Sequence, residues 1–171
     1  YGLAMHLDGA RVFNAAISRN VEPEYVVQDF DTVSFCLSKG LGAPVGSVLV
    51  GTEDLINVGR RWRKVLGGGM RQAGIIAAAG LYALENNIPS LRQDHEKAQD
   101  LFETVAARFG SEKVRCATNM LHLNIGEDLY ASLSTTLLDN GILVGRPRWV
   151  LHRDISQSSV EKIKRLVNSF K

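Results

Sequence analysis

The sequence predicts an α/β protein in which a mostly parallel sheet with helices on its faces is followed by a smaller α+β domain. Before Pro89, short apolar and β-branched segments alternate with helix-forming segments, which is typical of a mostly parallel sheet. After Pro89, one amphipathic helix is followed by several short strands and two further helices, which is typical of an α+β domain. We therefore expect a first domain over 1–87 and a second over 88–171.

The elements of the first domain follow from apolar spacing and from turn residues. Apolar residues that end at Asp8 and Gly9 predict a buried strand, and "ARVFNAAIS" after them has helical spacing. Thr52 is expected as the N-cap of a later helix, which ends before Gly67. The expected strands are 3–7, 32–37 and 46–51, and the expected helices are 10–18, 24–28, 52–66 and 70–87.

The second domain begins with the amphipathic segment "PSLRQDHEKAQDLFETVAARFG", in which Pro89 suits a helix start and Gly110 a helix end. Short apolar runs and helical spacing then alternate. The expected strands are 114–117, 121–125, 142–144 and 149–151, and the expected helices are 129–139 and 158–170.

Composition excludes several classes of protein. With 45% hydrophobic and 22% charged residues and a net charge of +2, the chain has an ordinary globular composition and no basic pattern that predicts a nucleic-acid or membrane partner. Neither Cys36 and Cys116 nor the histidines have metal-ligand spacing, so no metal site is expected. Without a disulfide framework, we expect a reducing, cytoplasmic location. Because Tyr1 is not a methionine, we expect the true start, and any targeting segment, to lie upstream.

Two residues at strand ends are candidates for chemistry. Lys39 follows one expected strand and precedes the loop "GLGAPVG", and Asp8 ends another, so both should lie at one edge of a parallel sheet. An amine and a carboxylate in one crevice suit pyridoxal phosphate, because the lysine binds the aldehyde and the carboxylate keeps the ring nitrogen protonated. The residues alone leave other interpretations open. Lys39 could be a solvated strand end, and Asp8 could be a turn residue or a helix cap. His6 lies two residues before Asp8 on the same expected strand face, so it could lie beside the site, although a core or turn role is expected.

Three long motifs identify a family. The segments "HLDGARVFNAA", "DTVSFCLSKGLGAPVGSVLVG" and "RRWRKVLGGGMRQAGIIAAAGLYAL" resemble the low-specificity L-threonine aldolases, pyridoxal-phosphate enzymes of the aspartate-aminotransferase fold type I. The resemblance implies that 1–87 is the carboxyl half of the cofactor-binding large domain and that 88–171 is the small carboxyl-terminal domain. It also implies cleavage of L-threonine or L-allo-threonine to glycine and acetaldehyde.

The resemblance assigns roles to individual residues. It implies that Lys39 carries the cofactor covalently, that Asp8 pairs with the pyridine nitrogen, and that Arg11 lies near the cofactor's phenolic oxygen and the substrate carboxylate. In "RPRWVLHRD", Arg148 matches the arginine that binds the substrate carboxylate, with Arg146 and Arg153 as nearby alternatives. Without the resemblance, these three arginines would be interpreted as solvated surface residues.

The same resemblance implies a homodimer or homotetramer with shared active sites. Lys64 and Arg71 would reach across the subunit interface toward a neighbour's cofactor phosphate, and the amides of Gly67–Gly69 would suit an anion. The alternative for the basic cluster around Lys64 is a charged, solvated helix face.

The sequence departs from the family in one respect, because the family's N-terminal half of the large domain has no counterpart before Tyr1. In the family that half supplies the group that stacks on the ring and the loop that holds the phosphate. We therefore expect either a fragment of an aldolase or a natural truncation, with apolar sheet surface left exposed. A related β-eliminating lyase and a catalytically silent binding or dimerisation module are the alternative functions.

Overall fold

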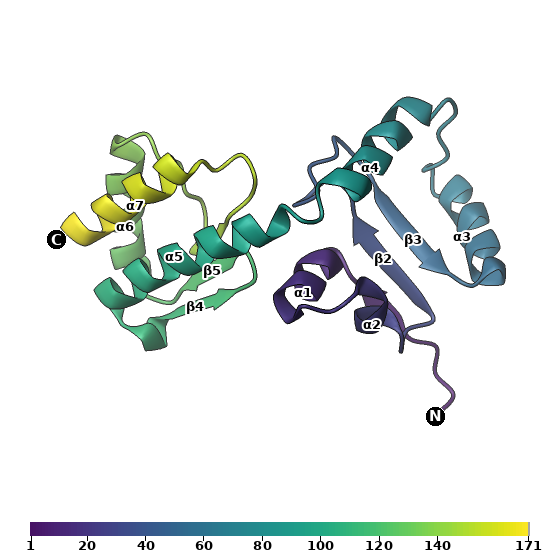
Figure 1. Ribbon diagram of the computed structural model, residues 1–171, viewed down its shortest axis with the longest axis horizontal. Helices are drawn as coiled ribbons and strands as arrows, with labels where there is room; N and C mark the ends of the chain where they lie inside the picture. The colour runs from purple at the N-terminus through teal and green to yellow at the C-terminus, as the bar shows by residue number, and fades with distance from the viewer. Residues whose placement is uncertain (171) are drawn as a thin grey trace. The chain divides into compact units, whose positions relative to one another are not determined.

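The computed structural model describes residues 1–170, in which the chain forms two compact units (Figure 1). Unit 1 comprises Tyr1–Leu91 and unit 2 begins at Arg92. This division lies near Pro89, where the composition of the sequence changes and where a domain boundary was expected. Among the described residues, no helix combines the length and the apolar character that crossing a membrane requires.

Unit 1 is built on a three-stranded sheet in the order β1-β2-β3. Strand β1 runs parallel to β2, whereas β3 runs antiparallel to it. Two helices separate β1 from β2, and two more follow β3 (Figure 1). The elements are β1 (His6–Asp8), α1 (Val12–Arg19), α2 (Pro23–Val27), β2 (Thr32–Cys36), β3 (Ser47–Gly51), α3 (Glu53–Val65) and α4 (Gly74–Asn86).

The sheet of unit 1 is mixed, whereas the sequence predicted a mostly parallel one. Only residues 37–46 connect β2 to β3, and they contain no helix. A parallel connection needs a crossover of a dozen or more residues, so a link of this length returns the chain antiparallel. The Leu37 amide closes the link by donating to the Gly46 carbonyl at 3.0 Å.

Two helix starts in unit 1 differ in detail from the prediction. Thr52 is the N-cap of α3 as expected, but its side chain makes no capping hydrogen bond. The helix expected from residue 70 begins at Gly74, because Gln72 has a φ of +49°, in the left-handed region that interrupts a helix.

Unit 2 has the predicted α+β organisation, with an antiparallel sheet in the order β4-β5-β6. A strand was expected over 142–144, where the burial of the side chains alternates, but these residues form no strand. Ile142 and Val144 pack against the core while Leu143 is exposed, so their alternation reflects burial without strand pairing. The elements are α5 (Leu91–Phe109), the 3-10 helix η1 (Ser111–Lys113), β4 (Val114–Ala117), β5 (Met120–Leu123), α6 (Glu127–Asp139), β6 (Arg148–Val150) and α7 (Gln157–Ser169).

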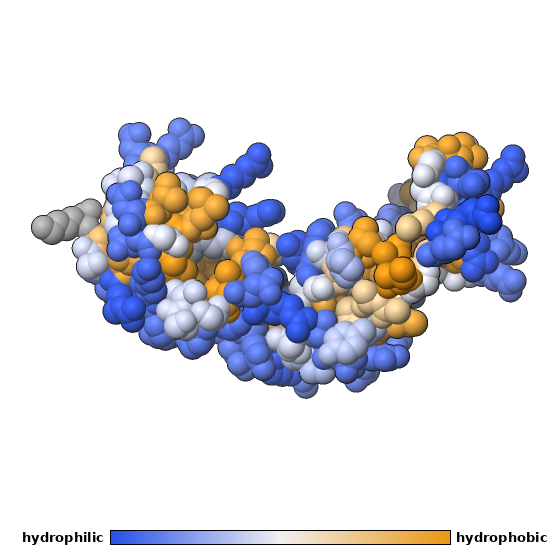
Figure 2. Space-filling view, turned by 90° about the horizontal axis from the view of Figure 1, so that it is seen from above, coloured by the Kyte–Doolittle hydropathy of each residue, from blue (hydrophilic) through white to orange (hydrophobic). Residues whose placement is uncertain are grey.

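The two units bury very different cores. In unit 2, α5, α6, α7 and the sheet enclose a cluster of sixteen buried apolar residues. The buried cluster of unit 1 contains only Leu41, Ala43, Ala83 and Leu91. Most of the large apolar side chains that stay exposed in the described chain belong to unit 1. Figure 2 shows hydrophobic patches, in orange, on this face of both units. Burial of apolar area therefore stabilises unit 2 far more than unit 1.

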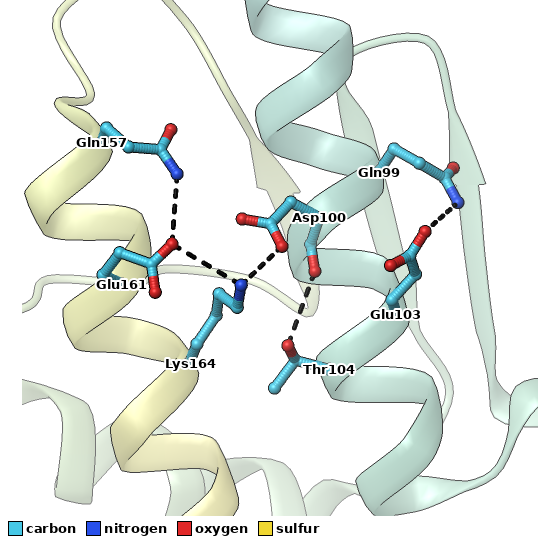
Figure 3. Close-up of polar contacts among 7 residues, drawn as sticks. All are labelled: Gln99, Asp100, Glu103, Thr104, Gln157, Glu161 and Lys164. Atoms are coloured by element: carbon cyan, nitrogen blue, oxygen red, sulfur yellow. Dashed lines mark hydrogen bonds and ion pairs between the residues drawn. The ribbon is translucent and has the colours of Figure 1, made fainter.

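A polar network joins the first and last helices of unit 2 (Figure 3). Lys164 on α7 donates to Asp100 on α5 at 2.5 Å and forms an ion pair with Glu161 at 3.5 Å. The hydrogen bond to Asp100 raises the pKa of Lys164. Because these side chains are partly solvated, the network adds little to the stability of unit 2.

Removing a core side chain of α6 should destabilise unit 2 strongly. Leu133 is fully buried, whereas Leu138 on the same helix is 55% exposed. We expect Leu133→Ala to lower the free energy of unfolding of unit 2 by about 2–5 kcal/mol, because it leaves a cavity. Leu138→Ala should change it by less than about 0.5 kcal/mol. Urea unfolding followed by circular dichroism measures both values, and equal losses would contradict the packing described here.

Candidate active site

The parallel pair β1 and β2 brings two candidate residues to one edge of the sheet. Asp8, the last residue of β1, is in register with Ser34 of β2, and Lys39 lies in the loop that follows β2. The Gly9 amide donates to the Ser34 carbonyl at 2.8 Å. A Cβ on Gly9 would lie 3.1 Å from that oxygen, so glycine allows the chain to turn this closely against β2.

Asp8 combines a turn with a free carboxylate oxygen. The Ala10 amide donates to Asp8 Oδ1 at 3.2 Å, which is the Asx turn expected of an aspartate before glycine. Asp8 is not a helix cap, because Arg11 occupies the N-cap of α1. No described residue bonds to Asp8 Oδ2, and the side chain is exposed. The turn therefore leaves one oxygen able to accept a hydrogen bond from a ligand.

Lys39 extends from a loop that is fixed at its centre. The Gly42 amide donates to the Lys39 carbonyl at 2.8 Å. The side chains of Leu41 and Ala43, in the same loop, are buried. The buried side chain of Asn87, at the end of α4, donates from Nδ2 to the Leu41 carbonyl at 2.7 Å. Lys39 itself is exposed, and its amine has no bonding partner among residues 1–170. The loop is held while the amine stays available.

Two residues that support the Lys39 loop could not be identified from the sequence. Asn87 and Leu41 are 46 positions apart, and nothing in the local pattern of either residue points to the other. A Cβ on Gly40 would lie 2.8 Å from Leu91 Cδ2, so this glycine makes room for the core of unit 1.

Four further residues that the sequence singled out in unit 1 lie at different points. Arg11 is half-buried at the start of α1, three residues after Asp8. Lys64 is exposed in the last turn of α3, and Arg71 is exposed in the segment before α4. His6 is exposed on β1, where Nδ1 lies 2.9 Å from Thr32 Oγ1.

The expectation that Gly67–Gly69 bind an anion through backbone amides is not met. Gly68 donates to the Arg63 carbonyl at 2.8 Å and Gly67 to the Lys64 carbonyl at 3.2 Å. With Gly67 at a φ of +84°, these bonds form a Schellman motif that ends α3. Two of the three amides are therefore already used, and α4 begins only at Gly74.

The donor set at this sheet edge fits pyridoxal phosphate. An exposed amine without a partner can take up the aldehyde, and a carboxylate with a free oxygen can accept from the pyridine nitrogen. Within residues 1–170, no group of three or more His, Cys, Asp or Glu side chains could hold a metal ion. The amine and the carboxylate therefore suit an organic carbonyl cofactor.

Arg148 belongs to unit 2, where the backbone around it is closely held. Its amide donates to the Arg146 carbonyl at 2.6 Å, and the Leu123 amide donates to the Pro147 carbonyl at 2.9 Å. The Tyr130 hydroxyl lies 2.7 Å from the Arg146 carbonyl oxygen, and burial raises the pKa of Tyr130. Arg148 also lines a cavity of 280 Å³, and no described residue pairs with its guanidinium.

Comparison of the sequence with known proteins gives consistent matches. Residues 1–127 match the family described as beta-eliminating lyase. The chain is 43% identical to a low specificity L-threonine aldolase of Escherichia coli over 94% of its own length and 49% of the relative's. It is 44% identical to low-specificity L-threonine aldolase 1 of Arabidopsis thaliana, over 94% of this chain and 48% of the relative. The chain thus spans about half the length of these relatives, and it matches the carboxyl-terminal half of the bacterial one.

Solved structures show the same fold at lower sequence identity. An Exiguobacterium structure described provisionally as an aromatic amino acid beta-eliminating lyase/threonine aldolase aligns with a TM-score of 0.81 and 21% identity, over 99% of this chain and 53% of that one. A Listeria monocytogenes structure described provisionally as an L-allo-threonine aldolase aligns with a TM-score of 0.78 and 21% identity, over the same shares of the two chains. An ornithine aminotransferase of Toxoplasma gondii with partly occupied pyridoxal phosphate aligns with a TM-score of 0.58 and 16% identity, over 82% of this chain and 36% of that one.

The anchor on the Lys39 loop can be tested with two neighbouring asparagines. We expect Asn87→Ala to lower the free energy of unfolding by about 1–3 kcal/mol, because the buried Leu41 carbonyl loses its side-chain partner. Asn86 is exposed and bonds only to the Tyr82 carbonyl within α4, so Asn86→Ala should change the free energy of unfolding by less than about 0.5 kcal/mol. Hydrogen exchange across 37–46 should accelerate in the first variant alone. Equal behaviour of the two variants would show that the anchor does not hold the loop.

Proposed function

The chain belongs to the beta-eliminating lyase family, and from that premise we propose that it forms the lysine-bearing half of an L-threonine aldolase site. The proposed reaction is the pyridoxal-phosphate-dependent cleavage of L-threonine or L-allo-threonine to glycine and acetaldehyde. Aldolase relatives at 43–44% identity support the choice within the family. The single observation that carries it is that the Lys39 amine and Asp8 Oδ2, neither of which has a partner among residues 1–170, belong to residues at one edge of the β1–β2 pair.

When bound, pyridoxal phosphate supplies an electron sink for the pair released from the breaking Cα–Cβ bond. Lys39 would hold the cofactor through Nζ, and the anchored loop would keep that attachment point in place. Asp8 Oδ2 would accept from the pyridine N–H and so hold the proton on that nitrogen. A charge-assisted hydrogen bond of this kind contributes about 1.5–3 kcal/mol.

The arginines would bind and orient the substrate. A planar guanidinium binds a carboxylate bidentately, and a fixed carboxylate decides which bond at Cα is aligned for cleavage. Arg148 would take this role, and Arg11 would lie near the cofactor's phenolic oxygen and the same carboxylate. The substrate's β-hydroxyl loses a proton, the Cα–Cβ bond breaks to release acetaldehyde, and Cα gains a proton to give glycine.

We also propose a homodimer or homotetramer in which Lys64 and Arg71 face a neighbour's cofactor phosphate. Both residues are exposed, and the apolar surface around them is extensive. Trp62 is 57% exposed and Leu66 is 80% exposed on the same stretch of chain. A second subunit on this surface would bury these side chains, and it would place two cations beside an anionic group.

Acetaldehyde release tests the proposed function. The 171-residue chain with pyridoxal phosphate should not cleave L-threonine, because a site that lacks part of its cofactor contacts loses most of its rate through poor orientation. A chimera that joins the preceding half of the Escherichia coli relative to Tyr1 should cleave it. Borohydride reduction of the chimera followed by peptide mapping should find the cofactor on Lys39.

The outcomes of this experiment separate the alternatives. A keto acid and ammonia in place of acetaldehyde would identify a β-eliminating lyase, which the name of the matching family also suggests. No turnover by the chimera, with Lys39 unmodified, would identify a catalytically silent module. A reduced adduct on Lys64 would overturn the assignment of the lysine.

Replacing Asp8 tests the role of the carboxylate. In the chimera, we expect Asp8→Asn to lower kcat by roughly a hundredfold or more, because a neutral amide cannot keep the ring nitrogen protonated. Thermal stability should change little, since the amide oxygen can still accept from Ala10. Asp29→Asn is the matched control at an exposed aspartate. If Asp8→Asn melts the protein while the folded fraction keeps full activity, the turn is the residue's only role.

A further inference from the structure

We propose that Tyr130 is a positioning residue that fixes the Gly145–Arg148 corner and thereby places the Arg148 guanidinium for the substrate carboxylate. The inference deepens the proposed function and rests on it. Tyr130 lies on α6 and Arg148 begins β6, so the residue acts from a different element of unit 2.

The corner before Arg148 is a sharp one. The Arg148 amide donates to the carbonyl two residues earlier, that of Arg146, at 2.6 Å, which is the bond of a γ-turn across Pro147. On one side, the Pro147 carbonyl is held by the Leu123 amide of β5. On the other side, the carbonyls of Gly145 and Arg146 both lie near the Tyr130 hydroxyl, at 2.9 and 2.7 Å.

The Tyr130 hydroxyl is itself held in place. It carries one proton, so it donates to one of the two carbonyls at a time, and it accepts from Trp149 Nε1 at 3.1 Å. Trp149 is a buried residue of β6, and Leu133, one turn after Tyr130 on α6, is fully buried. The hydroxyl thus connects the corner to the core of unit 2 from both sides of Arg148.

Nothing else in the described chain fixes the guanidinium of Arg148. The side chain is exposed, and no described residue bonds to it or forms an ion pair with it. On the neighbouring strand Arg148 is opposite His122, which is in turn opposite Arg115, so the adjacent strands offer no carboxylate. The direction of Arg148 therefore depends on its backbone, and a loose backbone would spread the guanidinium over more orientations.

The experiment uses the chimera described above and the isosteric variant Tyr130→Phe. We expect the KM for L-threonine to rise by roughly three- to tenfold, the effect of losing one or two hydrogen bonds, while kcat stays within about twofold. Tyr25→Phe removes an exposed hydroxyl that bonds to none of the residues 1–170, and it should change neither value. Val160→Ala weakens the same core away from the corner and should lower stability without raising the KM.

A double-mutant cycle tests whether Tyr130 acts through Arg148. Arg148→Ala alone should raise the KM more than Tyr130→Phe does, and adding Tyr130→Phe to it should raise the KM no further. Hydrogen exchange in the 171-residue chain provides a readout without cofactor or turnover. The Arg148 amide should exchange faster in Tyr130→Phe, while the amides of α5 stay unchanged.

Each result decides between definite alternatives. If Arg148→Ala raises the KM but Tyr130→Phe leaves it unchanged, the positioning role is wrong and the proposed function stands. If Arg148→Ala leaves the KM unchanged, the substrate role of Arg148 fails, and the positioning role fails with it. Unchanged exchange of the Arg148 amide in Tyr130→Phe would also overturn the inference, because the hydroxyl would then not hold the corner.

Discussion

The contact between Gly9 and the Ser34 carbonyl is the constraint on which the candidate site depends. It sets β1 beside β2 in parallel at the point where β1 ends, so Asp8 and the Lys39 loop leave the sheet at the same edge. A residue with a Cβ at position 9 would press on the Ser34 oxygen and on Val33. The chemistry proposed for the site thus begins with a backbone hydrogen bond between two strands.

The two units hold their own candidate residues in different ways. Unit 2 has a large core, and Tyr130 and Trp149 use it to hold the backbone that carries Arg148. Unit 1 has a small core and relies on single polar anchors such as Asn87. The loss of one side-chain hydrogen bond therefore weakens the support of a candidate residue more in unit 1 than in unit 2.

Local patterns predicted most of the fold and the residues with reactive groups, because helix spacing and strand composition are written in neighbouring residues. These patterns failed where the outcome depends on distant partners.

The alternation at Ile142–Val144 indicated burial correctly, but a strand also needs a neighbouring strand to pair with. The direction of β3 followed from the length of its connection, which apolar spacing does not encode. The three glycines suggested an anion site, yet the end of α3 uses two of their amides. Asn87 and Tyr130 act on backbone far away in the sequence, so no local pattern could identify them. The residue roles taken from family resemblance stay predictions.

The anchoring of the Lys39 loop has a consequence for timescales. Because Asn87 fastens the loop at Leu41, the Lys39 amine can change position by rotation about the bonds of its own side chain. Such rotamer changes in exposed residues take picoseconds to nanoseconds, whereas loop rearrangements take nanoseconds to microseconds. Movement of this amine therefore takes place on the fast timescale of side-chain rotation and needs no rearrangement of the peptide beneath it.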